Sequence, residues 1–134
     1  MIREAINPNT LFPSTQYGFS HGIKSAGRTT IHCSGQVAWD VNFQIVGAGD
    51  LGAQTQQALA NLKEVLQAAG ATPADVVRMR TYIVDYELGC LETVSALLAE
   101  FYGGELPAAS TLIGVQALAM PDFLIEIEAT AVID

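Results

Sequence analysis

The feature that most constrains the fold is an alternation of side chains along residues 123–133. One set is apolar throughout: Phe123, Ile125, Ile127, Ala129, Ala131 and Ile133. The intervening set is mixed: Leu124, Glu126, Glu128, Thr130 and Val132. Successive side chains of a strand point to opposite faces, so this segment predicts a strand with one face in a hydrophobic core. Its mixed face is a candidate contact with another subunit.

Two helices and several more strands are expected before this segment. From Leu51 to Ala69 apolar residues recur at spacings of three and four, and Gly70 supplies a stop signal, which predicts an amphipathic helix. The stretch from Leu88 to Phe101 predicts a second helix. Strands are expected at residues 17–24, 28–37, 79–85, 110–115 and 124–133.

The first two of these strands are joined by a turn-forming Ser25-Ala26-Gly27, so the first third of the chain predicts a hairpin. In its second strand Ser34 and Gln36 are expected to share one face, with Gly35 on the other. The whole order of elements predicts a single α+β domain over residues 1–134, with both helices on one face of a mixed sheet.

Composition limits the partners of this domain. Hydrophobic residues make up 50% of the chain and charged residues only 15%, so we expect apolar surface between the subunits of a small homo-oligomer that binds a small molecule. A formal charge of −8 with six scattered basic residues argues against nucleic acid, whose phosphates require clustered Lys and Arg.

Membrane, metal and cofactor sites are also not expected. No apolar run approaches the ~20 residues that span a bilayer, and the N-terminus lacks the apolar stretch of a signal peptide, so the expected location is the cytoplasm. His21 and His32 are the only histidines, and Cys33 and Cys90 are expected to be free thiols. Without metal-ligand spacing among them, neither a metal nor another cofactor is expected.

The residues that could carry chemistry leave alternatives open. Glu126 and Glu128 share one face of an otherwise hydrophobic strand, where a carboxylate withdrawn from water suits proton transfer. The pattern alone favours a pair of solvated surface charges, which is the ordinary role of Glu. Ser34 has no triad partners, and His32 and Cys33 point to opposite faces, which excludes a dyad between them. Tyr17 is either a binding hydroxyl or the aromatic start of a strand.

Taken in order, however, several segments resemble the RidA family, also called YjgF or L-PSP, over nearly the whole chain. These segments are Tyr17-Gly18, IHCSGQV at 31–37, NLKEVLQAAGA at 61–71 with DVVRMRTYIVD after it, LPAASTL at 106–112 and IEIEATAVI at 125–133. The resemblance implies a chorismate-mutase-like α+β fold and a homotrimer, with a central barrel of sheets and three clefts between neighbouring subunits.

The resemblance also implies an activity, the hydrolysis of reactive enamines and imines from amino acids to ammonia and a 2-keto acid. By position, Glu126 would match the acid that positions or activates water. Tyr17 and Ser34 would match residues that line the cleft, and Gly35 would match a glycine that permits close approach.

Two positions depart from the family's deaminases, which carry an arginine where this chain has Ala109 and commonly a cysteine where it has Thr111. That arginine holds the substrate carboxylate with a two-pronged hydrogen bond that alanine cannot make. No Lys or Arg follows Arg80 in the chain. A cleft built from the C-terminal segments would therefore repel anions unless Arg78, Arg80 or a neighbour's N-terminal cation reaches it.

Two functions of different classes follow from these residues. The first is hydrolysis of an enamine or imine that lacks an α-carboxylate or is held by backbone N–H groups near Ser110 and Thr111. The second is a non-catalytic trimer that binds or senses a neutral or cationic metabolite. Glu126, Tyr17 and Ser34 favour the first, whereas Ala109 and the acidic charge favour the second.

Overall fold

A four-stranded mixed sheet forms the centre of the molecule, in a computed structural model that describes all residues 1–134. Its strands, in spatial order, are β3 (Thr29–Gln36), β6 (Ile125–Ile133), β4 (Val76–Val84) and β5 (Ala109–Val115). The strand β6 runs antiparallel to both of its neighbours, and β4 and β5 are parallel. The expected mixed α+β sheet is therefore confirmed.

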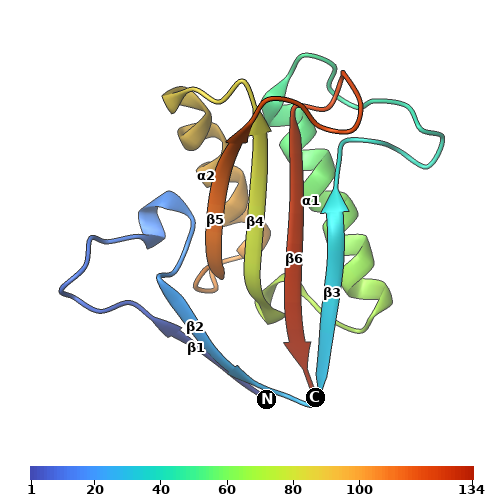
Figure 1. The fold of residues 1–134 in the computed structure, drawn as a ribbon. Helices are drawn as coiled ribbons and strands as arrows, with labels where there is room; N and C mark the ends of the chain where they lie inside the picture. The colour runs from blue at the N-terminus through green and yellow to red at the C-terminus, as the bar shows by residue number, and fades with distance from the viewer.

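Two helices cover one face of this sheet and leave the other face open (Figure 1). They are α1 (Leu51–Ala68), capped by the Asp50 carboxylate on the Ala53 N–H at 3.0 Å, and α2 (Leu88–Tyr102). The apolar stripe of α1 packs against β6 and β3, and Leu62 and Leu66 are fully buried. Both helices match their predicted positions because their apolar spacing decides which side faces the sheet.

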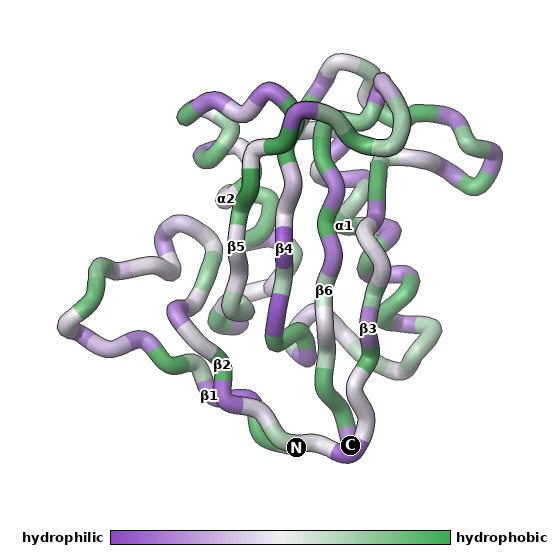
Figure 2. The backbone as a smooth tube through the Cα atoms, in the orientation of Figure 1, coloured by the Kyte–Doolittle hydropathy of each residue, from purple (hydrophilic) through white to green (hydrophobic).

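The alternation along β6 is confirmed. Ile125, Ile127 and Ala131 have no exposed surface, while Glu126 and Glu128 between them are half-buried. Figure 2 shows hydrophobic and hydrophilic positions alternating along this strand. The core therefore lies between the sheet and the two helices, and the charged positions lie on the uncovered face.

The predicted hairpin in the first third is wrong. Residues Thr15–Tyr17 form a 3₁₀ turn, η1, and the strand β2 (Gly22–Ala26) begins only after it. This strand pairs antiparallel with β1 (Ile2–Ile6), for which no strand was predicted, while β3 pairs with β6. Strand propensity identifies extended segments but not their partners, which depend on contacts distant in sequence.

Two distant contacts explain the observed pairing. The Arg3 guanidinium on β1 donates to the carbonyls of Val76 and Leu106, both at 2.8 Å, which ties the small sheet to the larger one. Between β2 and β3, a Cβ on Gly27 would lie 2.6 Å from a Val132 methyl group and 2.7 Å from the Ile133 carbonyl. Gly27 thus lets the chain pass close to the end of β6 instead of folding back as a hairpin.

The chain termini meet at one end of the molecule (Figure 1). The amino group of Met1 forms an ion pair with Asp134 at 2.6 Å. A short 3₁₀ turn, η2 (Pro73–Asp75), leads into β4. Neither helix has the length and hydropathy needed to cross a membrane.

Candidate functional site

The uncovered face of the sheet holds most of the polar side chains that the sequence singled out. Strand register places Tyr82 beside Glu126, Arg80 beside Glu128 and Arg78 beside Thr130 across β4 and β6. On the other side of β4, Arg78 lies beside Ala109 and Arg80 beside Thr111 of β5. Paired residues share a face, so these side chains form one continuous polar surface.

At one end of this surface, Gly35 and Glu126 lie against each other. A β-bulge between Cys33 and Gln36 inserts one extra residue into β3. A Cβ on Gly35 would lie 2.6 Å from the Glu126 carboxyl carbon and 2.7 Å from its Cγ, so only glycine leaves room for this carboxylate. The close-approach glycine implied by the resemblance therefore has a physical counterpart here.

The bulge also overturns the predicted faces of this strand. Gly35 faces Glu126 rather than the core, and Gln36 pairs with Ile127 on the opposite side from Ser34. The Gln36 amide donates to the Ser34 carbonyl at 3.1 Å, and Ser34 itself is exposed. Strict alternation predicted that Ser34 and Gln36 point together, but one inserted residue reverses every later position in a strand.

The two carboxylates of β6 differ in their partners. The Tyr82 hydroxyl donates to Glu128 Oε1 at 2.5 Å, and this hydrogen bond is the main cause that raises the pKa of Tyr82. The Glu126 carboxylate has no hydrogen bond or ion pair within the chain. Glu126 is therefore the carboxylate that is available to water or a ligand.

The remaining predicted residues gather at the other end of the sheet, around β5. Tyr17, Ser110 and Thr111 line a hollow of about 190 Å³ between η1, α2 and the edge strand β5. Thr81 also lines it, and its buried hydroxyl has no hydrogen-bond partner, an atom that water or a bound molecule can satisfy. Ala109 starts β5 on the uncovered face, next to Thr111.

Within one chain, these two ends do not meet. Ala109 lies beside Arg78, whereas Glu126 lies beside Tyr82, which is four residues farther along β4. Four residues of a strand span about 13 Å, and two strand spacings add about 10 Å sideways. A small molecule held at Ala109 therefore does not reach Glu126 of the same chain.

Arg78 was not among the predicted site residues, although it was one of the cations considered able to reach the cleft. Its guanidinium donates from Nη2 to Thr111 Oγ1 at 3.3 Å, so it crosses from β4 toward β5 above Ala109. The predicted strand began at residue 79, whereas β4 begins at Val76. A longer strand would have shown Arg78 and Arg80 alternating with the buried Met79 and Thr81.

The histidine and cysteine residues do not form a reactive site. Cys33 is buried and His32 is exposed on opposite faces of β3, as predicted. Burial raises the pKa of the Cys33 thiol, which favours its neutral and unreactive form. Cys33 and Cys90 are both free, and no group of three or more His, Cys, Asp or Glu side chains is placed to hold a metal ion.

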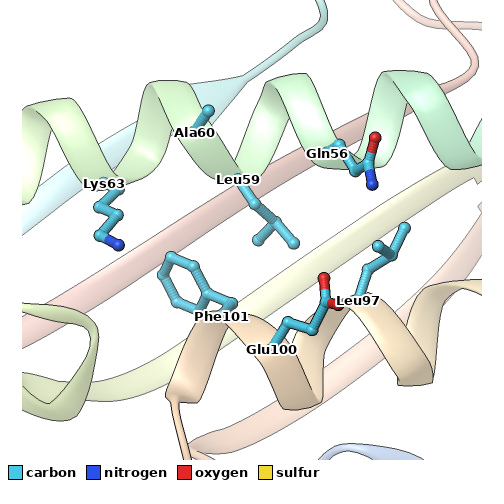
Figure 3. Close-up of a pocket in the computed structure, with 7 residues that line it drawn as sticks. All are labelled: Gln56, Leu59, Ala60, Lys63, Leu97, Glu100 and Phe101. Carbon is cyan, nitrogen blue, oxygen red and sulfur yellow. The ribbon is translucent and has the colours of Figure 1, made fainter.

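A second hollow of about 210 Å³ lies on the other side of the sheet, between α1 and α2. Figure 3 shows Leu59 from α1 and Phe101 from α2 pointing into it, with Lys63 and Glu100 at its border. It contains none of the predicted site residues. The uncovered sheet face and the β5 edge therefore remain the candidate site.

Comparison with known proteins agrees with this fold. The model of the family described as Endoribonuclease L-PSP matches residues 10–133. A solved structure of a protein of unknown function, from the conserved Rid protein family of Yersinia pestis, is 57% identical. It superposes with a TM-score of 0.96, and the match covers 98% of this chain and 99% of that one.

Two curated relatives are more distant. A RutC family protein from Pyrococcus horikoshii is 33% identical over 84% of this chain and 85% of its own length. A 2-iminobutanoate/2-iminopropanoate deaminase from Dermatophagoides farinae is 31% identical over 78% of this chain and 79% of its own length. From the family match, the shared fold and these relatives, the chain belongs to the L-PSP family, also called RidA or YjgF.

Proposed function

We propose that this protein hydrolyses small enamine or imine intermediates and releases ammonia, with Glu126 as the catalytic carboxylate. In this reaction an enamine takes a proton on carbon to become an imine, water adds to the C=N carbon, and the adduct loses ammonia to leave a carbonyl group. A single carboxylate can accept the proton of water and return one to the leaving nitrogen. The relative named as an iminobutanoate and iminopropanoate deaminase supports this reaction class.

The observation that carries the proposal is the contact between Glu126 and the backbone of Gly35. The glycine leaves space for the carboxylate on an otherwise crowded strand pair, and no side chain within the chain neutralises that carboxylate. A structural surface charge does not need such space. A carboxylate that must reach a substrate and water does.

The separation of the two ends supports a site that is completed by a second copy of the chain. The uncovered face carries apolar and charged side chains together, and its residues at Ala109 lie too far from Glu126 to share one small substrate. A homotrimer that packs uncovered faces together would bring Glu126 of one subunit near Ala109, Thr111 and Tyr17 of the next. We propose that three such clefts are the active sites.

The substrate at Ala109 is held without an arginine at that position. Ser20 bridges to Ala109 at the start of β5, and beyond this bridge β5 is the edge of the four-stranded sheet, so alternate N–H groups after Ser110 point away from β4. These donors suit a carbonyl or a neutral polar group. The substrate thus either lacks an α-carboxylate or presents it to another group.

The direct test compares Glu126→Gln with Glu128→Gln in an assay of ammonia and carbonyl release from freshly generated enamine, with an uncatalysed blank. The two glutamates share one strand and one face, but Glu128 is held by Tyr82. We expect Glu126→Gln to abolish turnover and Glu128→Gln to retain most of it. Equal loss in both variants, or turnover that survives Glu126→Gln, would contradict the role of Glu126.

The second candidate function, a trimer that binds a metabolite without turnover, is favoured by Ala109 and the net charge of −8. The same assay separates the two. A wild-type protein that binds imines or their carbonyl products but never exceeds the uncatalysed rate would be a binding protein.

A further inference from the structure

Two arginines mark a second feature of the uncovered face. Arg78 and Arg80 lie two residues apart on β4 and therefore point to the same side. They border a hollow of about 230 Å³. Its other lining residues are Glu128, Ala129 and Thr130.

Neither arginine is neutralised within the chain. The chain has 14 acidic residues, yet its only ion pair joins the Met1 amino group to Asp134. Arg78 is half-buried, and its single side-chain hydrogen bond is the one from Nη2 to Thr111 Oγ1. A guanidinium carries five N–H donors in a fixed fork, so most of its donors face the hollow without a partner.

The one carboxylate at this hollow is directed away from Arg78. Glu128 accepts the hydrogen bond of Tyr82, which lies on the far side of Arg80 from Arg78 along β4. The Arg78 end is therefore locally positive in a chain that is otherwise strongly acidic. The hydroxyls of Thr111 and Thr130 lie on the two strands that flank Arg78.

We infer that this hollow binds the carboxylate of a small molecule, with Arg78 as the principal ligand and Arg80 in support. Arg78 lies beside Ala109 and extends over β5 to Thr111, so its guanidinium occupies the neighbourhood of a side chain at position 109. If the proposed reaction holds, the carboxylate of the substrate is bound by Arg78 on β4 and not by a residue of β5. That assignment rests on the proposed function, but binding of the carboxylate does not.

The test is a titration of the intact protein with pyruvate, a stable 2-keto acid, and in a parallel arm with inorganic phosphate, followed by calorimetry and by amide NMR shifts. Arg78→Ala should weaken pyruvate binding by about tenfold to a hundredfold, the effect of losing a charge-assisted pair. Arg78→Lys should also weaken it, because an ammonium group cannot make the two-pronged contact. Lys63→Ala on α1 removes the same charge on the other side of the sheet and should change nothing.

The binding claim is kept separate from catalysis by a titration of Glu126→Gln, which removes a negative charge from the proposed cleft and should bind pyruvate at least as tightly as wild type does. Circular dichroism and the oligomer mass establish that each variant is folded. Equal pyruvate affinity in wild type and a folded Arg78→Ala, or no binding of pyruvate at millimolar concentration, would overturn the inference. Binding of phosphate alone would overturn the assignment of a carboxylate.

Discussion

The two faces of the four-stranded sheet are built from the same strands but differ in how complete they are. On the covered face Met79, Ile83 and Ile127 are at most 1% exposed and belong to the hydrophobic core. On the uncovered face Arg78 and Glu126 lie half-buried without a charged partner. One face is completed within a single chain, whereas the other presents charges with no partner in the chain, which are left to water, a ligand or another copy.

The largest effect should come from the covered face. Leu62 has no exposed surface and lies in the centre of the core. Leu62→Ala removes that packing and leaves a cavity, so we expect the free energy of unfolding to fall by about 2–5 kcal/mol. Chemical denaturation measures this loss. The matched substitution Arg80→Ala on the uncovered face should lower the free energy of unfolding by less than about 0.5 kcal/mol. A similar loss of stability in both variants would contradict the difference between the two faces.

A pH effect should also arise on the covered face. Tyr102 is 3% exposed, and burial raises its pKa to about 12, although the Ala108 backbone and Arg3 act in the opposite direction. The unfolded chain loses this proton near pH 10 and the folded chain near 12, so the stability that Tyr102 contributes is lost as pH rises between them. The loss amounts to about 2–3 kcal/mol. Denaturation curves of wild type and Tyr102→Phe should diverge over this range, and parallel curves would contradict the assignment.

On the uncovered face, Ala109→Arg should change activity rather than stability. An arginine at this position adds, beside the contact inferred for Arg78, a second charge-assisted contact with a short α-carboxylate, worth about 1.5–3 kcal/mol or roughly a tenfold to hundredfold gain if it serves the transition state. Turnover of 2-aminoacrylate by wild type should be slow and should rise in the variant. Glu126→Gln in the same background should remove the gain. A folded variant without any gain would favour the metabolite-binding function.

The smallest expected effect concerns RNA, for which no measurable affinity is expected near physiological salt. Arg78 and Arg80 form the only close pair of basic side chains on this face, and a net charge of −8 surrounds them. Filter binding over a salt series tests this expectation. Salt-sensitive binding that disappears in Arg78→Ala and Arg80→Ala would make this hollow a phosphate-backbone site.

The same contrast explains what could be predicted from the sequence. Residues of the covered face, such as Leu62 and Ile127, follow the periods of a helix or strand because burial imposes those periods. The bulge at Gly35 and the neighbour relation of Arg78 and Ala109 depend on register between strands distant in sequence. No local pattern encodes that register, so the pairing of β1 with β2 and the division of the site into two ends were missed.

The central claim is that the active site joins the uncovered faces of two copies. It can be tested with mixed oligomers of two variant chains, each expected to be inactive alone. One chain carries Glu126→Gln, and the other carries Ala109→Trp, whose large side chain fills the cleft. The two chains carry different tags and are coexpressed, and native mass spectrometry measures the mixed oligomers.

Hydrolysis of freshly generated enamine by the purified mixed trimers is then the deciding measurement. If each cleft takes Glu126 from one subunit and position 109 from the next, every mixed trimer contains about one cleft in three with both wild-type groups. We therefore expect the mixed trimers to show about one third of wild-type activity, although each variant is inactive alone. Mixed trimers as inactive as their parents would contradict a shared site and require both groups to act within one chain.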